Sequence, residues 1–158
     1  MTEARHDMEA LMRAQGSTPF IQALGAEVIG AEPGKSTMRL PYRADIVGNP
    51  DTGVVHGGVI TGLLDHACGM AVGSALGVGA GAASSSTMRG IATLDLRIDY
   101  MKAAKPGVDI FVFAECVKIT HQIVFARGKA YQESQDDLIA SATGAFIITE
   151  LRPADVKA

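Results

Sequence analysis

The sequence predicts an α+β fold in which an antiparallel β-sheet wraps around one long central helix, with a helical extension at the N-terminus. The longest apolar segment, residues 54–76, is apolar on nearly every side of a helix, which is typical of a buried helix. Several β-like runs follow it, and the short turns between them favour antiparallel pairing. These runs cover residues 91–101, 109–119, 123–132 and 138–149.

The chain begins with a predicted helical extension over residues 1–22. Apolar side chains fall at helical spacing in residues 3–15, and Gly16 ends that run. In Ser17-Thr18-Pro19, either hydroxyl residue can cap a second short helical turn that starts at the proline. We expect this extension to lie over the larger domain that follows.

Two strands are predicted between residues 26 and 42, on either side of a turn at Glu32-Pro33-Gly34. Residues 37–42 alternate between polar and apolar side chains, which is the period of a strand. Residues 44–55 are predicted to be irregular. A turn is expected at residues 49–53, because Asn, Pro, Asp and Gly gather there.

The length of 158 residues fits a single domain, which we place at residues 23–151, with a C-terminal tail at residues 152–158. The formal net charge of −3 argues against a nucleic-acid partner. No uncharged stretch is long and apolar enough to cross a bilayer, so no membrane partner is expected. The two cysteines make no disulfide framework, which favours a cytoplasmic location.

The segment His56-Gly57-Gly58 lies where the long helix is predicted to begin. The first amides of a helix have no partner within it, and together with the helix dipole they attract negative charge. Two glycines would let a ligand approach the backbone closely. The segment is therefore a candidate anion site, and the alternative is a tight turn into the helix that needs small residues.

Asp65 is the one acidic residue between Asp51 and Asp95, and it lies in the middle of an apolar helix. A carboxylate in apolar surroundings is costly to bury unless it is hydrogen-bonded or protonated. Asp65 is therefore either a functional carboxylate or an aspartate held by a structural donor such as His66. Cys68 is interpreted as a small core residue. The spacing of these groups matches no metal-binding motif, so no metal site is expected.

Two stretches of the sequence resemble the signature of hotdog-fold acyl-CoA thioesterases of the phenylacetate-degradation (PaaI-like) type. The first runs from Asn49 to Ala71 and contains His-Gly-Gly, followed after six residues by Asp65. The second runs from Thr93 to Ala104 and resembles a characteristic strand of that family. The resemblance implies a sheet wrapped around one helix, a homodimer whose sheets pair edge to edge, and active sites between subunits. A tetramer built from two dimers is the alternative assembly.

The resemblance also implies a role for each matching residue. Asp65 would be the catalytic carboxylate, acting as general base or nucleophile, and the Gly57 amide would polarise the thioester carbonyl. Asn49 would orient water or substrate, and His56 would shape the loop beside the carbonyl. Thr93 would lie near the reaction centre. The candidate substrate-binding residues are Gly58, His66, Lys102 and Arg127.

The expected reaction is hydrolysis of an acyl-CoA thioester to free acid and coenzyme A. No cofactor is expected, because coenzyme A is part of the substrate. Thioester hydrolysis needs a base or nucleophile and hydrogen-bond donors for the developing oxyanion. Two alternatives remain open at this point: an enoyl-thioester hydratase or dehydratase on the same fold, and a non-catalytic module that binds acyl thioesters.

Overall fold

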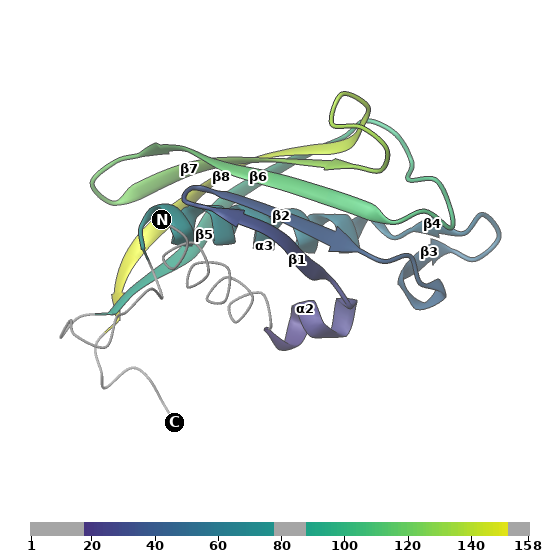
Figure 1. The fold of residues 1–158 in the computed structure, drawn as a ribbon, viewed down its shortest axis with the longest axis horizontal. Helices are drawn as coiled ribbons and strands as arrows, with labels where there is room; N and C mark the ends of the chain where they lie inside the picture. Colours follow the sequence, from purple (N-terminus) through teal and green to yellow (C-terminus); the bar gives the residue numbers. More distant parts are fainter. Residues whose placement is uncertain (1–17, 78–87, 152–158) are drawn as a thin grey trace.

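A computed structural model of the protein describes residues 18–77 and 88–151 (Figure 1). The helix predicted over residues 3–15 and the predicted tail over residues 152–158 lie outside the described residues. The helices and strands in chain order are α2 (Pro19–Leu24), β1 (Glu27–Glu32), β2 (Lys35–Leu40), a 3₁₀ helix η1 (Ala44–Ile46), β3 (Val47–Asn49), β4 (Val54–Val55), α3 (Gly57–Ala75), β5 (Met88–Tyr100), β6 (Ile110–Ile119), β7 (Ile123–Tyr131) and β8 (Leu138–Leu151).

Six strands form one antiparallel sheet in the order β1-β2-β6-β7-β8-β5. The sheet curves over α3, and all six of its strands contact this helix (Figure 1). The fold class, the long central helix and the antiparallel sheet are therefore confirmed. Strand β5 lies at one end of the sheet order, so one of its edges is unpaired within the described residues.

The segment between β2 and α3 differs from the irregular stretch predicted over residues 44–55. It holds the short helix η1 and the hairpin β3–β4, whose turn falls at the predicted position. The amides of Thr52 and Gly53 both donate to the carbonyl of Asn49, which closes this turn. The apolar pair Val54–Val55 belongs to the hairpin, and α3 begins only at Gly57 because His56 caps it.

The core lies between the concave face of the sheet and α3. Small residues are needed where strand and helix come closest: a Cβ placed on Gly128 of β7 would lie 3.0 Å from Leu64 Cδ2 and 3.2 Å from Cys68 Sγ. Ser36 of β2 is buried and donates its hydroxyl to the carbonyl of Ala67, 2.8 Å away. The largest fully buried side chains are Phe146, Ile21, Met38, Leu40, Leu63, Leu64, Ile110 and Ile139.

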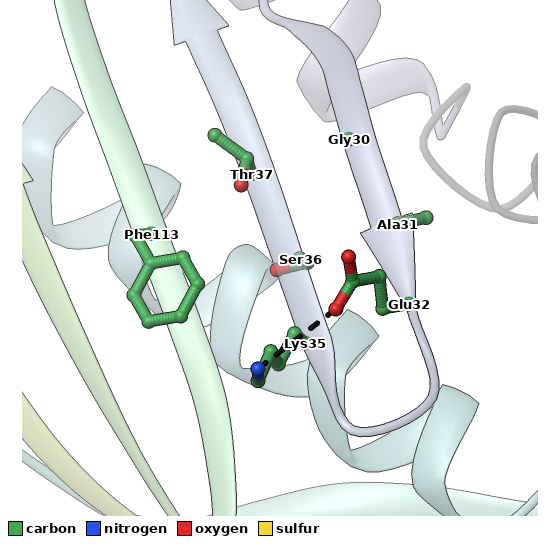
Figure 2. A pocket seen from close by; sticks show the side chains of 7 residues that line it. All are labelled: Gly30, Ala31, Glu32, Lys35, Ser36, Thr37 and Phe113. Carbon is green, nitrogen blue, oxygen red and sulfur yellow. Dashed lines mark ion pairs between the residues drawn. The ribbon is translucent and has the colours of Figure 1, made fainter.

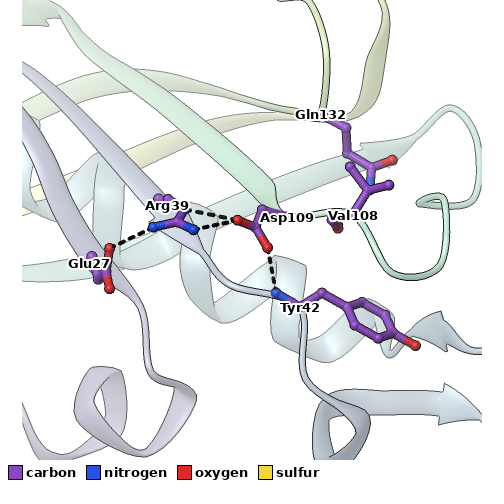
Figure 3. A network of polar contacts seen from close by, with 6 residues as sticks. All are labelled: Glu27, Arg39, Tyr42, Val108, Asp109 and Gln132. Atoms are coloured by element: carbon purple, nitrogen blue, oxygen red, sulfur yellow. Dashed lines mark hydrogen bonds and ion pairs between the residues drawn. The ribbon is translucent and has the colours of Figure 1, made fainter.

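A polar network ties the end of β2 to the start of β6 (Figure 3). Asp109 Oδ2 accepts from Arg39 Nε at 2.9 Å and from Arg39 Nη2 at 2.7 Å, and Asp109 Oδ1 accepts from the Tyr42 amide at 2.8 Å. Arg39 Nη1 also lies 3.3 Å from Glu27 Oε2. The Tyr42 amide and then Arg39 hold the pKa of Asp109 below its usual range. This network fixes the register of β1, β2 and β6 at one end of the sheet.

Candidate active site

The carboxylate of Asp65 and the hydroxyl of Thr93 meet at the side of α3 that faces β5. Thr93 Oγ1 donates to Asp65 Oδ1 over 3.0 Å, and Asp65 is half-buried. The structure therefore brings together two residues that the sequence placed in the site, and the observed donor to Asp65 is Thr93 rather than His66. Within the described residues, no group donates to Asp65 Oδ2, so this oxygen is available to a water molecule or a substrate.

A pocket of about 360 Å³ opens beside Asp65 and extends along α3. Thr18, Asp65, His66 and Thr93 form its polar part. Gly69 leaves space in the groove, which a Cβ at this position would fill in ordinary van der Waals contact with Phe146 Cε1, 3.8 Å away. The pocket is thus a largely apolar groove with a carboxylate at one end. The lining residues are Thr18, Asp65, His66, Gly69, Met70, Gly73, Ile91, Thr93 and Phe146.

Two further side chains near Asp65, those of His66 and Cys68, are not suited to act as nucleophiles. Among the described residues, nothing hydrogen-bonds the buried Nε2 atom of His66, and burial lowers the pKa of this imidazole against the opposing effect of the Asp65 charge. Cys68 is fully buried, and burial raises the pKa of its thiol to about 12. A thiol with this pKa is almost never ionised near neutrality, which fits a small core residue.

The start of α3 presents one free amide. His56 caps the helix, and its Nδ1 accepts from the Gly58 amide at 2.9 Å. The Val59 amide donates to the His56 carbonyl at 3.0 Å. Among the described residues, nothing accepts the N–H of Gly57. Because His56 uses Nδ1 as an acceptor, its neutral ring carries the proton on Nε2, which can donate outward.

Gly57 and Asp65 do not share a pocket within one chain. Gly57 lines a separate hollow of about 330 Å³, together with Tyr100 and Lys102. Asp65 lies eight positions after Gly57 on the helix, which corresponds to about 12 Å along the helix axis. A single copy of the chain therefore cannot bring the free amide and the carboxylate to the same carbonyl group.

The remaining site candidates lie at the surface. Asn49 is exposed, and its Oδ1 accepts from the Asp51 amide at 3.0 Å, which makes it part of the β3–β4 turn. Lys102 forms an ion pair with Asp137. Arg127 Nε lies 2.6 Å from Glu115 Oε1 on neighbouring strands, away from both hollows described above.

Another hollow, of about 240 Å³, lies on β1, β2 and β6 (Figure 2). Its charged groups, Lys35 and Glu32, form an ion pair of 3.8 Å. The hydroxyl of Ser36 is bonded to Ala67 on the helix side, so it is not available as a nucleophile. The hollow also holds the hydroxyl of Thr37, whereas its carboxylate, Glu32, is paired with Lys35.

Tyr100 is a site residue to which the sequence analysis assigned no role. It ends β5, and its hydroxyl donates to the Gly57 carbonyl at 2.6 Å. The available signal was its place in the motif-bearing strand that starts at Thr93, but the contact itself depends on the fold.

The described residues contain neither a candidate metal site nor a helix that could span a membrane. No three His, Cys, Asp or Glu side chains gather in a way that could hold a metal ion. None of the described helices combines the length and apolar character that a membrane span requires.

Comparison with known sequences places these features in a family. The sequence profile of the thioesterase superfamily matches residues 52–139. A putative esterase of Halobacterium salinarum is 34% identical over 101 residues, which cover 63% of this chain and 61% of that protein. The medium/long-chain acyl-CoA thioesterase YigI of Escherichia coli K12 is 29% identical over 134 residues, which cover 82% of this chain and 85% of YigI.

Solved structures of similar proteins share the fold. A Pseudomonas aeruginosa protein is 40% identical, with a TM-score of 0.72, and the match covers 89% of this chain and 98% of that one. The phenylacetic acid degradation protein PaaI of Thermus thermophilus is 25% identical, with a TM-score of 0.67, over 82% of this chain and 98% of PaaI. Because the matched profile spans more than half of the chain, this protein belongs to the thioesterase superfamily and has the hotdog fold.

Proposed function

We propose that the protein hydrolyses acyl-CoA thioesters to the free acid and coenzyme A, with Asp65 as the catalytic carboxylate. One observation carries the proposal: a half-buried carboxylate, held by Thr93 through one oxygen, stands at the end of an apolar groove. Membership in the thioesterase superfamily and the similarity to an acyl-CoA thioesterase support it.

In this reaction Asp65 has two chemical options. As a general base, its free oxygen takes a proton from a water molecule while the water oxygen attacks the thioester carbon. As a nucleophile, the carboxylate oxygen attacks the same carbon, and water then hydrolyses the resulting anhydride. In both routes the carbon–sulfur bond breaks, and coenzyme A leaves as a thiolate that takes up a proton.

The developing oxyanion needs a donor, and we propose the Gly57 amide for this role. An oxyanion donor must lie about 3 Å from the charged oxygen. The separation of about 12 Å within α3 supports a donor that comes from a second copy of the chain. The unpaired edge of β5 offers a way to pair two copies edge to edge. We therefore propose a homodimer as the active unit, with a dimer of dimers as the larger alternative.

The groove beyond Asp65 suits the acyl group. Its far walls are formed by Gly69, Met70, Gly73, Ile91 and Phe146, so no charged side chain has to be desolvated there when an apolar chain enters. The medium/long-chain specificity in the name of YigI agrees with an apolar acyl group.

The remaining proposed roles concern the polar part of the substrate. Lys102 lines the hollow beside Gly57, which makes it the better placed candidate for a phosphate of coenzyme A, although it would have to leave Asp137. Arg127, His66 and Gly58 stay predicted substrate contacts. Asn49 stays a predicted orienting residue, and the cytoplasm stays the predicted location.

The test is a thiol-release assay over a panel of acyl-CoAs that differ in chain length and in aromatic or aliphatic character. We expect turnover with apolar acyl groups. Loss of the crotonyl-CoA double bond without thiol release would favour the hydratase alternative. Tight binding without turnover across the panel would favour the binding module, and either result would overturn the proposed hydrolysis.

A further inference from the structure

Two hydroxyl groups converge on the carbonyl oxygen of Gly57. Tyr100 Oη donates to this oxygen over 2.6 Å, and Thr61 Oγ1 lies 3.2 Å from it as a second donor. The two hydroxyls are themselves 2.7 Å apart. Because the proton of Tyr100 is committed to Gly57, Thr61 can donate either to the phenol oxygen or to the carbonyl. The three groups form a closed polar cluster at the first turn of α3.

This cluster acts at the first residue of α3, and the amide of the preceding residue, His56, donates to the Ile46 carbonyl at 2.9 Å. Gly57 is the first residue of α3, and helix ends fray. A glycine also has a wider choice of backbone conformations than any other residue. The cap formed by His56 fixes the neighbouring Gly58 amide and leaves the Gly57 N–H without an acceptor among the described residues. The hydroxyl of Tyr100 is therefore the contact that ties the Gly57 peptide to the sheet.

The fit between Gly57 and Tyr100 is close. A Cβ added to Gly57 would lie 3.3 Å from Tyr100 Oη and 3.4 Å from Tyr100 Cζ, which is tighter than ordinary van der Waals contact. The phenol therefore takes the space that a side chain at position 57 would need. The absence of a side chain at Gly57 therefore leaves the room that the tyrosine at the end of β5 occupies.

We propose that Tyr100, supported by Thr61, is a positioning residue that holds the Gly57 carbonyl and thereby fixes the backbone of Gly57, so that the Gly57 N–H in the preceding peptide unit can donate to the oxyanion. This inference rests on the proposed thioester hydrolysis. Strand β5 then positions both the catalytic carboxylate and the oxyanion donor, since Thr93 donates to Asp65 and Tyr100 donates to Gly57. The role of Tyr100 is geometric, because its hydroxyl contacts the Gly57 carbonyl and its bond leaves the N–H free.

Positioning of this kind affects the transition state more than substrate binding. The oxyanion forms only as the thioester carbon is attacked, so a misplaced amide lowers kcat and leaves KM nearly unchanged. Small misplacements are costly, and about 1 Å can reduce a rate by roughly a hundredfold.

The kinetic test compares single-hydroxyl variants. In Tyr100→Phe we expect kcat to fall about tenfold with KM within about twofold of the wild type. Thr61→Val should give a smaller loss that is not additive with Tyr100→Phe, and Thr61→Ser should restore the wild-type rate because it keeps the hydroxyl. Tyr131→Phe is the matched control, since that ring stacks on Phe111, with centroids 5.9 Å apart, away from the cluster. Its kcat should not change.

Two kinetic results would overturn the inference. One is a Tyr100→Phe variant with wild-type kcat. The other is a loss of kcat in Tyr100→Phe that is matched by an equal rise in KM or by the same loss in Tyr131→Phe. Sedimentation of each variant shows whether it assembles as the wild type does, and a kcat loss explained by dissociation would also count against positioning.

A second measurement does not depend on hydrolysis. In ¹⁵N-labelled protein, the Gly57 amide signal should shift and its backbone order parameter should fall in Tyr100→Phe, and neither should happen in Tyr131→Phe. An unchanged Gly57 signal in Tyr100→Phe would overturn the positioning role whatever the activity. If the wild type hydrolyses no acyl-CoA of the panel while the Gly57 signal responds as expected, the proposed function fails and the positioning of this peptide stands.

Discussion

The substitution Asp65→Asn tests the carboxylate at the centre of the proposed chemistry. Asparagine has nearly the same shape as aspartate and keeps an oxygen that can accept from Thr93 Oγ1, which lies 3.0 Å from Asp65 Oδ1. The carboxamide carries no negative charge, so it can neither take a proton from water nor attack the thioester carbon. The change therefore removes the chemistry while keeping the local hydrogen bond.

The expected magnitudes differ strongly for stability and for rate. Because Asp65 is half-buried and the bond from Thr93 survives, the free energy of unfolding should change by less than about 1 kcal/mol. A general base contributes roughly 10²- to 10⁴-fold to a rate. That range corresponds to about 3–5 kcal/mol of activation free energy. We therefore expect a folded variant whose kcat is lower by at least about a hundredfold.

The assay measures thiol release and thermal unfolding on the same preparations, with Asp136→Asn as the matched control. Asp136 is exposed in the turn between β7 and β8, so its amide variant should hydrolyse acyl-CoA at the wild-type rate. An Asp65→Asn variant with kcat within about tenfold of the wild type would show that the carboxylate acts neither as base nor as nucleophile.

Three further predictions follow from the groove, the polar network and the core. Gly69→Val should narrow the groove, so that kcat/KM for longer acyl groups falls about tenfold or more relative to acetyl-CoA, and equal losses across a chain-length series would contradict this. Asp109→Asn should destabilise the fold by about 1–2 kcal/mol near pH 7. Since the pKa of Asp109 is lowered by folding, its stabilisation is present above the unfolded pKa near 4 and is lost as pH falls, so denaturation curves of wild type and variant should converge in acid. Gly128→Ala would press its new methyl group against Leu64 at 3.0 Å, and calorimetry should show a loss of about 1–3 kcal/mol.

Local patterns in the sequence were enough for the main elements of the fold. The apolar run before residue 77 predicted the long helix, and alternation predicted the strands that follow it. The hairpin β3–β4 was missed because each of its strands has only two or three residues. Such short strands carry no period, and backbone hydrogen bonds across the turn define them.

The candidate site, like the fold, was predictable from the sequence only in part. His56, Gly57 and Asp65 were recognisable because their spacing along one helix is a property of the sequence. The resemblance placed the amide and the carboxylate in active sites between subunits, and the structure shows that within one chain they line different hollows. That separation makes a second copy of the chain part of the proposed mechanism.

The sequence by itself determined that a buried helix carries one carboxylate and begins at two glycines, because helical period and capping act over a few residues. Only the tertiary structure decided which groups hold these residues in place. Thr93 reaches Asp65 across 28 positions of the chain, and Tyr100 reaches Gly57 across 43. Both contacts depend on the register of β5 in the sheet and on how α3 packs beneath it. Packing of the whole core sets the register of β5 and the position of α3, and no local sequence pattern encodes either of them.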